Sequence, residues 1–289
     1  MYTSTSIEFV TARKMTHNEG IKLVKDAGFT AYDMSFTDML FSDHSRFDDD
    51  DYLEYAKSVR EYADSIGIVC NQAHAPFHSS TGQAEKDAVI YKKIVRSIEC
   101  AAILGAKNIV VHPKQHLRYL GHEQVLKELN LEFYSELAKV AEKCGICVAA
   151  ENMWQTENNR IWHSTCSKPS EFCEYIDMVN HKNIVACLDI GHVSLVDEDI
   201  PDFIRALGKD RLKCLHVHDT NLVEDSHTLP FYGKIDYNAV CEALKEIGYC
   251  GDITLEANSF INKLPLSILP SGLKVMAEVA DYIRQKVEG

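Results

Sequence analysis

Apolar residues recur along the chain in short runs, and each run is followed by a longer stretch with the spacing of an amphipathic helix. The runs are rich in β-branched and aromatic residues, which favours strands. We predict strands at residues 5–10, 31–36, 68–76, 108–113, 147–153, 184–192, 212–220 and 251–258. Helical spacing is clearest at residues 50–67, 85–105, 123–145 and 271–289. This alternation is typical of βα units that build a parallel sheet.

Glycines mark the ends of several predicted helices. Gly28, Gly67, Gly105, Gly145 and Gly248 each stand shortly before a predicted strand, as glycines at helix C-termini do. No linker or low-complexity segment interrupts the series, so we expect one domain over residues 1–289. Eight such units predict an α/β fold, a single (β/α)8 TIM barrel, in preference to an open doubly wound sheet. No glycine-rich phosphate loop follows the first strand, so no nucleotide cofactor is expected.

Composition and charge narrow the class of protein. The chain is 46% hydrophobic and carries a formal net charge of −13, which makes nucleic acid an unlikely partner. It contains no apolar run that would cross a membrane and no apolar leader segment, so we expect a cytoplasmic protein without a membrane partner. The ten cysteines are scattered through predicted strands and helices, which favours reduced thiols over disulfides.

Polar residues with acid–base or metal-binding chemistry stand near the ends of six successive predicted strands. They are His74 and His78, His112, Glu151, Asp189 and His192, His216 and His218, and Glu256. In a TIM barrel the active site lies at the C-terminal ends of the strands. Apolar neighbours surround each of these residues, so each would be buried at a cost unless it were paired or bound to a metal ion.

Strand periodicity predicts that several of these side chains point into the barrel. Residues two apart in a strand face the same side, so His216 and His218 point inward while Leu215 and Val217 face the helices. The same alternation directs Asp189 inward on the preceding strand. The acidic and imidazole groups of the last four strands should therefore converge at one mouth.

Four of the converging residues form a mixed oxygen and nitrogen ligand set: Glu151, Asp189, His216 and Glu256. This set suits a divalent metal ion such as Mn²⁺, Zn²⁺, Co²⁺ or Mg²⁺. Any one of the four alone is better explained as a hydrogen-bonded residue of a barrel layer. Together they favour a metal site, because a cluster of carboxylates without a cation would repel itself.

The motifs "HAP", "VVHP", "EN", "LDIGH", "HVHD" and "LE" occur in an order that resembles the xylose isomerase-like TIM-barrel superfamily. The resemblance covers nearly the whole chain and is more specific for the superfamily than for a substrate. This superfamily contains sugar (phosphate) isomerases and epimerases, inositol-catabolism enzymes and endonuclease IV, of AP endonuclease family 2. The resemblance implies that Glu151, Asp189, His216 and Glu256 are metal ligands and that His192 lines the same site.

The segment "EDSHTLPFYGKIDY" at residues 224–237 is similar to a loop that covers the substrate in this superfamily. Asp225 and His227 in this loop, together with His74 and His112, resemble the additional ligands of the three-zinc cluster of endonuclease IV. All nine ligand-type positions of that cluster are then present. This similarity keeps a phosphodiesterase function open.

The resemblance and the residues together favour a metal-dependent isomerase or epimerase that acts on a small sugar, sugar phosphate or cyclitol. Glu151 and Glu256 would form the acid–base pair and transfer a proton through a metal-stabilised enediolate. His192 and His218 would bind hydroxyl groups or move protons. Such enzymes often pair, so a homodimer is possible by analogy.

Three alternatives remain at this point. One is an endonuclease IV-like zinc phosphodiesterase, a metal-dependent hydrolase, and another is an inosose-dehydratase-like lyase. The third is a barrel that binds a metabolite without converting it, which would leave four converging ionisable groups without a chemical role. Lys114 and Arg118 follow the fourth strand and would contact a substrate phosphate, or else be solvated surface charges.

Overall fold

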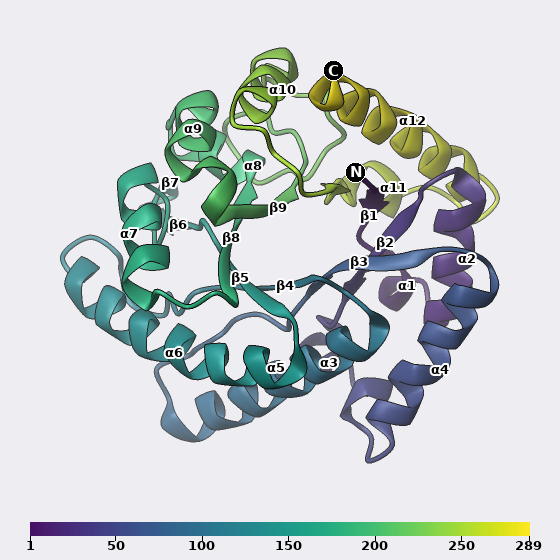
Figure 1. The fold of residues 1–289 in the computed structure, drawn as a ribbon, viewed down its shortest axis with the longest axis horizontal. Helices are drawn as coiled ribbons and strands as arrows, with labels where there is room; N and C mark the ends of the chain where they lie inside the picture. The colour runs from purple at the N-terminus through teal and green to yellow at the C-terminus, as the bar shows by residue number, and fades with distance from the viewer.

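A computed structural model describes all residues, 1–289, and shows a barrel of eight parallel strands (Figure 1). The strands are β1 (Thr3–Thr5), β2 (Ala31–Ser35), β3 (Val69–His74), β4 (Asn108–Val111), β5 (Cys147–Glu151), β8 (Ile184–Asp189), β9 (Leu212–His216) and β10 (Ile253–Leu255). Six of them pair continuously in the order β2-β3-β4-β5-β8-β9, and β1 pairs with β10. The predicted TIM-barrel fold is confirmed.

Two isolated backbone bridges join these two sheets and close the barrel. Ser6, just after β1, pairs with Asp33 of β2, and Val217, just after β9, pairs with Leu255 of β10. Both bridges are parallel, as are all pairs within the barrel. Closure leaves no free sheet edge and brings the C-terminal ends of all eight strands to one mouth.

Eight long helices follow the strands in the chain, one after each, and Figure 1 shows them surrounding the barrel. They are α2 (His17–Ala27), α4 (Tyr52–Ser65), α5 (Ala84–Leu104), α6 (Glu123–Cys144), α7 (Pro169–Val179), α9 (Ile200–Arg211), α10 (Tyr237–Glu246) and α12 (Leu269–Glu288). Shorter pieces are α1 (Phe9–Ala12), α3 (Asp38–Phe41), η1 (Arg46–Asp48), α8 (Ile190–Leu195) and α11 (Ser259–Asn262). The helices cover the outer faces of the strands and bury the main core between them.

Local sequence signals explain where these helices begin and end. The hydroxyl of Thr16 accepts from the backbone N–H of Glu19, whose side chain accepts from the backbone of Thr16, which forms a capping box at the start of α2. The helix ends at Gly28, whose φ of 108° is accessible to glycine at little cost.

A small apolar layer inside the barrel supports the mouth. It contains Val110, Ala149, Val185, Cys187 and Cys214. Because side chains two apart in a strand face the same side, the residues two positions further along β4, β5, β8 and β9 also point inward. Those residues are His112, Glu151, Asp189 and His216. The inward placement of Asp189 and His216 agrees with the predicted alternation.

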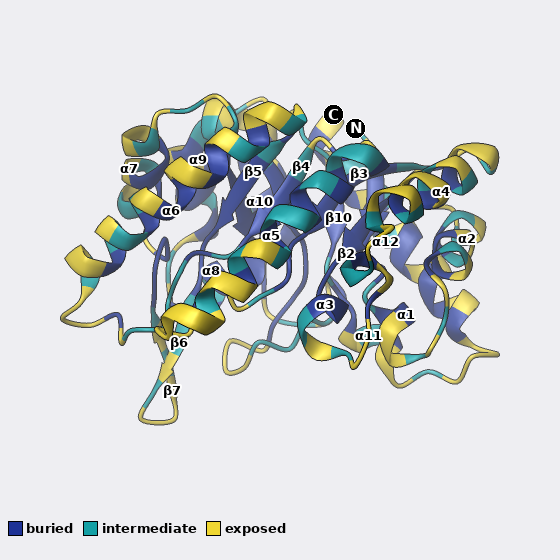
Figure 2. Cartoon of the chain, turned by 90° about the horizontal axis from the view of Figure 1, so that it is seen from below, coloured by how far each residue is buried: buried dark blue, intermediate teal, exposed yellow.

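Two features differ from the predicted elements. The first strand occupies Thr3–Thr5 instead of residues 5–10, because the chain leaves the ladder after Ser6 and turns into α1. An antiparallel hairpin of β6 (Trp154–Glu157) and β7 (Arg160–His163) also follows β5, where no hairpin was predicted. Figure 2 shows this hairpin projecting, largely exposed, from the end of the barrel that also carries α1, α3 and α11.

All ten cysteines are free thiols, as expected. None of the helices combines the length and the apolar composition needed to cross a membrane.

His17, at the start of α2, should make the stability of the protein depend on pH. Burial lowers the pKa of His17 to about 4, whereas an imidazole in an unfolded chain titrates near 6.5. Between these values only the unfolded chain takes up the proton, so stability that is present above pH 6.5 is lost as the pH falls toward 4. We expect the His17 contribution to the free energy of unfolding to fall by about 2 kcal/mol between pH 7 and pH 5.

The measurement is urea unfolding of the natural chain and of His17→Gln at both pH values. Glutamine does not titrate, so its variant should lose less stability between pH 7 and pH 5. An equal loss in both proteins would show that His17 is not the responsible group.

Candidate metal centre and active site

The four predicted ligands meet at the mouth of the barrel. His216 on β9 lies at the centre, with its Nδ1 2.9 Å from Glu151 Oε1, 3.3 Å from Glu256 Oε2 and 3.9 Å from Asp189 Oδ2. One potential ligand atom from each of the four lies within 4.8 Å of the others. Asp189 and His216 are fully buried, and Glu151 is 1% exposed.

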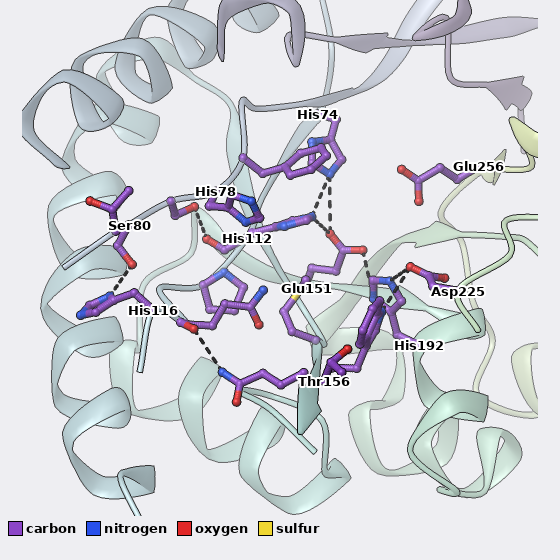
Figure 3. Close-up of a pocket in the computed structure, with 18 of the residues that line it drawn as sticks. His74, His78, Ser80, His112, His116, Glu151, Thr156, His192, Asp225 and Glu256 are labelled. Atoms are coloured by element: carbon purple, nitrogen blue, oxygen red, sulfur yellow. Dashed lines mark hydrogen bonds and ion pairs between the residues drawn. The ribbon is translucent and has the colours of Figure 1, made fainter. Parts of the chain in front are cut away.

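The second oxygen of Glu151 faces another pair of imidazoles. Its Oε2 lies 2.9 Å from Nε2 of His112 and 3.7 Å from Nε2 of His74, and the two Nε2 atoms are 3.1 Å apart. Figure 3 shows Glu151 between these histidines on one side and His192 and Asp225 on the other. Glu151 therefore bridges two potential ligand groups.

A third group forms around Asp225 on the loop after β9. Its Oδ2 lies 3.3 Å from His192 Nε2, 3.1 Å from His227 Nε2 and 3.2 Å from the indole nitrogen of Trp154. His218 contributes to this group and also contacts Asp189, at 3.0 Å from Oδ1. The four predicted metal ligands and the six residues predicted as possible further metal- or substrate-binding residues therefore lie in one continuous cluster.

Backbone contacts orient three of the imidazoles. Nδ1 of His74 lies 2.7 Å from the carbonyl oxygen of Ala75, Nδ1 of His192 lies 2.8 Å from that of Asn152, and Nδ1 of His227 lies 2.9 Å from that of Glu256. A carbonyl oxygen can only accept, so Nδ1 carries the proton in each ring. In the neutral ring the lone pair of Nε2 then faces the carboxylate cluster, as in histidines that bind metals.

Several buried atoms in the cluster accept or donate no hydrogen bond. They include Oε2 of Glu151, although His112 Nε2 lies only 2.9 Å away, as well as Oδ1 of Asp225 and Nε2 of His216. Burying a polar atom without a hydrogen-bond partner costs free energy. The lone pair of an imidazole nitrogen also repels the lone pairs of a carboxylate oxygen that faces it. The oxygen and imidazole donor set therefore fits a divalent cation, and the residues of these ligand groups are those that could hold one.

Contacts with imidazoles offset the free-energy cost of burying the charged carboxylates. Burial alone would raise the pKa of Glu151, but the imidazoles of His216 and His112 hold it well below its ordinary value. Burial would also raise the pKa of Asp225. The imidazoles of His192 and His227 outweigh burial, so the pKa of Asp225 is strongly lowered. Both carboxylates are therefore ionised at neutral pH.

The neighbouring carboxylates raise the pKa of two of the imidazoles. Burial lowers the pKa of His216, but Glu256 and other carboxylates raise it well above its ordinary value. Burial likewise opposes the charge on His227, and its contact with Asp225 raises the pKa to about 10. Asp33, at the end of β2, differs, because burial dominates and raises its pKa to about 6.

Two residues next to the predicted ligands explain why their motifs have this form. Asn152 donates to the carbonyl oxygen of Asp189 at 2.9 Å and accepts from its N–H at 2.8 Å, which locks the ends of β5 and β8 together. At Gly191, a Cβ atom would lie 2.0 Å from Cε1 of His218. Only glycine leaves room for that imidazole beside Asp189.

Asp219 holds the loop that carries Asp225 and His227. Its Oδ1 accepts from the backbone N–H groups of Thr220, Lys234 and Ile235 at 2.8–3.1 Å, and its Oδ2 accepts from Phe231 at 3.0 Å. This side chain is fully buried. The sequence motif "HVHD" contains this aspartate, but the motif alone does not reveal that the loop closes around it.

The mouth opens into a cavity of about 620 Å³. Ligand-type residues form part of its lining, whereas Asp189, His216 and His218 lie beneath it. Phe77 and Trp154 line the cavity. Sequence reasoning missed other lining residues, namely Ser79, Ser80, Thr81, Gln115, His116, Gln155 and Thr156. Neither Lys114 nor Arg118 lines it, and Arg118 pairs with Glu157 instead.

Sequence comparison identifies the family. The profile described as "Xylose isomerase-like TIM barrel" matches residues 21–285, which is nearly the whole chain. The chain belongs to this family. An uncharacterised protein of Methanocaldococcus jannaschii is 28% identical over 222 residues, which cover 74% of this chain and 71% of that protein.

Two further relatives in the xylose isomerase-like family have described activities or ligands. D-psicose 3-epimerase of Ruminiclostridium cellulolyticum is 31% identical over 129 residues, covering 45% of this chain and 40% of that enzyme. The crystal structure of IolI protein with a bound zinc atom superimposes with a TM-score of 0.75 at 18% identity, covering 100% of this chain and 98% of that one. The second comparison, at this low identity, supports the fold alone.

The role of Asp219 in holding this loop can be tested by substitution. Asp219→Asn replaces one acceptor oxygen with a donor and leaves a backbone N–H without its partner, which should lower the free energy of unfolding by about 2 kcal/mol. Because the same loop carries Asp225 and His227, the purified variant should also bind less metal than the natural chain. Urea unfolding and elemental analysis measure the two effects.

Asp210→Asn is the matched control, since Asp210 is exposed and makes no side-chain hydrogen bond. It should change neither quantity. Natural stability and metal content in Asp219→Asn would contradict the role of this loop anchor.

Proposed function

We propose that this protein is a metal-dependent isomerase or epimerase of a small sugar. The observation that carries the proposal is the placement of two carboxylates, Glu151 from β5 and Glu256 after β10, on one cavity with His216 between them. Inversion of a carbon next to a carbonyl needs one group to remove the proton from one face and another to return it on the opposite face. Two carboxylates on different strands meet that requirement.

Glu151 is the better candidate for the base that removes the proton. Its buried carboxylate is held in a fixed position by contacts to His112 and His216. Glu256 is the more accessible of the two, with 15% of its side chain exposed, and would return the proton to the other face of the substrate. The intermediate between these steps would be an enediolate of the sugar.

Glu151, Asp189, His216 and Glu256 would hold the divalent ion, which would supply a Lewis acid for the negative charge that develops on the sugar oxygens. The neighbouring side chains have separate tasks. Trp154 and Phe77 line the cavity and would exclude water beside the reacting sugar. His192 lies between Glu151 and Asp225 and would orient a hydroxyl group.

The relatives support a sugar as the substrate class. The similarity to a D-psicose 3-epimerase includes a shared region at 31% identity, and the fold is that of other epimerases with solved structures. The IolI structure, which has the same fold, is described with a bound zinc atom, so a barrel of this shape can hold a metal ion.

A second candidate function is a zinc-dependent phosphodiesterase, and two of the ligand groups favour it. His74, His112 and Glu151 form one group, and Asp225 with its histidine neighbours forms another, in addition to the four-residue set. Three ions side by side would suit attack of water on a phosphate. The numbers of ions and the substrate distinguish the two functions.

Metal content therefore gives one prediction. The protein should contain about one divalent ion per chain if a single isomerase site is occupied. The measurement is elemental mass spectrometry of protein that was purified without a chelator. Removing the metal with a chelator should abolish activity on ketoses, and adding back a divalent ion should restore it. Close to three zinc ions per chain, with hydrolysis of a phosphodiester, would favour the second function.

Proton exchange gives another prediction. The metal-loaded protein should incorporate solvent deuterium into a ketose, detected by NMR, because proton removal and return exchange with water. Glu151→Gln and Glu256→Gln should each lower this rate by about 10²–10⁴-fold, the usual contribution of a general acid or base.

Glu157→Gln is the control, because Glu157 lies on the hairpin outside the cavity. Unchanged exchange in either active-site variant would remove that carboxylate from the mechanism. Elimination of water instead of exchange would identify a lyase.

A further inference from the structure

The cavity extends well beyond the ligand cluster. Figure 3 shows Asp225 and Glu256 at one end and Ser80 and His116 at the opposite end, with Glu151 between them. We call the part lined by Ser80, His116, Gln115 and Thr156 the outer compartment. The whole cavity of about 620 Å³ lies in the range of ~300–1,000 Å³ that encloses a drug-sized ligand. A single hexose would leave much of it empty.

The walls of the outer compartment are tied together by one side chain. Gln155 of β6 accepts from the N–H of Tyr119 at 2.9 Å and donates to the carbonyl oxygens of Gln115 at 3.1 Å and Leu117 at 2.8 Å. These contacts fix the hairpin to the loop after β4. Trp154, Gln155 and Thr156 of β6 all line the cavity.

The lining of the cavity contains no lysine and no arginine. The polar groups of the outer compartment are hydroxyls, amides and imidazoles, and Ser80 Oγ lies 2.6 Å from His116 Nδ1. Phe77 lines the cavity nearer the ligand cluster, where it stacks on His112 with ring centroids 4.9 Å apart. Hydroxyl, amide and imidazole groups can form hydrogen bonds with the hydroxyls of a sugar ring, whereas a phosphate is usually met by arginine or lysine.

We propose that the outer compartment binds a second, uncharged ring that is attached to the reacting sugar. This inference rests on the proposed function and deepens it: the substrate is a glycoside or other neutral conjugate of the sugar, and not a sugar phosphate. The ligand cluster holds the reacting unit, and the hairpin and the loop after β4 hold the unit attached to it.

The first experiment compares three substrates with the metal-loaded protein. They are a free ketohexose, its terminal phosphate ester, and a disaccharide with a ketohexose as the reducing unit. Deuterium exchange should show kcat/KM about tenfold or more higher for the disaccharide than for the free ketose, since ring contacts add binding energy. The phosphate ester should be the poorest. Preference for the free ketose or the phosphate ester would overturn the proposal.

The second experiment fills the compartment. Thr156→Trp places a large side chain in the lining and should raise KM for the disaccharide by about tenfold while changing kcat less, because the lost contacts are remote from the reacting carbon. Arg160→Trp is the matched control, since Arg160 is an exposed residue of the same hairpin that does not line the cavity. Equal effects of both substitutions would contradict the proposal.

A binding measurement separates failure of this inference from failure of the proposed function. Calorimetry with the same disaccharide needs no turnover and can be performed on the metal-loaded chain and on both tryptophan variants. Binding that is lost in Thr156→Trp but retained in Arg160→Trp, without exchange of any sugar, would support the compartment and reject the isomerase reaction. Binding of the free ketose as tightly as the disaccharide would reject the compartment.

Discussion

Compensation of charge around Glu151 is the constraint on which the rest of the site depends. The carboxylate is 1% exposed, and its two oxygens face imidazoles that belong to two different ligand groups. A carboxylate buried to this extent is unstable without opposite charge or hydrogen-bond donors. The chain supplies them from the ends of β4 and β9, which lie on either side of β5 and β8 in the six-stranded sheet.

The same strands supply both the apolar interior of the barrel and the residues of the site. Ala149 and Cys187 fill the apolar layer, and the next inward positions on the same strands are Glu151 and Asp189. The packing that fixes the strands therefore also fixes the side chains at their ends. Loop residues complete the cluster differently, since Asp225 depends on the buried carboxylate of Asp219, which binds four backbone N–H groups.

Strand-end residues could be predicted from the sequence because their placement needs only the βα alternation and the two-residue period. The inward direction of Asp189 and His216 followed from that period alone. The hairpin after β5 was missed because its strands are four residues each and lack an apolar alternation. Its signal is the Asn158–Asn159 pair, both with positive φ, which is typical of a tight hairpin turn. Hydrogen-bond orientation of the imidazoles depends on backbone carbonyls that the sequence does not place.

The distribution of charge in the cavity limits where any reaction can occur. Negative charge develops on oxygen during enediolate formation and during attack on a phosphate, and it must be met by positive charge. The lining offers no lysine or arginine, so positive charge is available only from the imidazoles and from cations held by the carboxylates. For either proposed chemistry, the carboxylates that could hold a cation would place the reacting atoms at the Glu151 end. The outer compartment, as defined by Ser80, Gln115, His116 and Thr156, has no carboxylate to hold a cation, so it would act on the choice of substrate instead of on the chemical step.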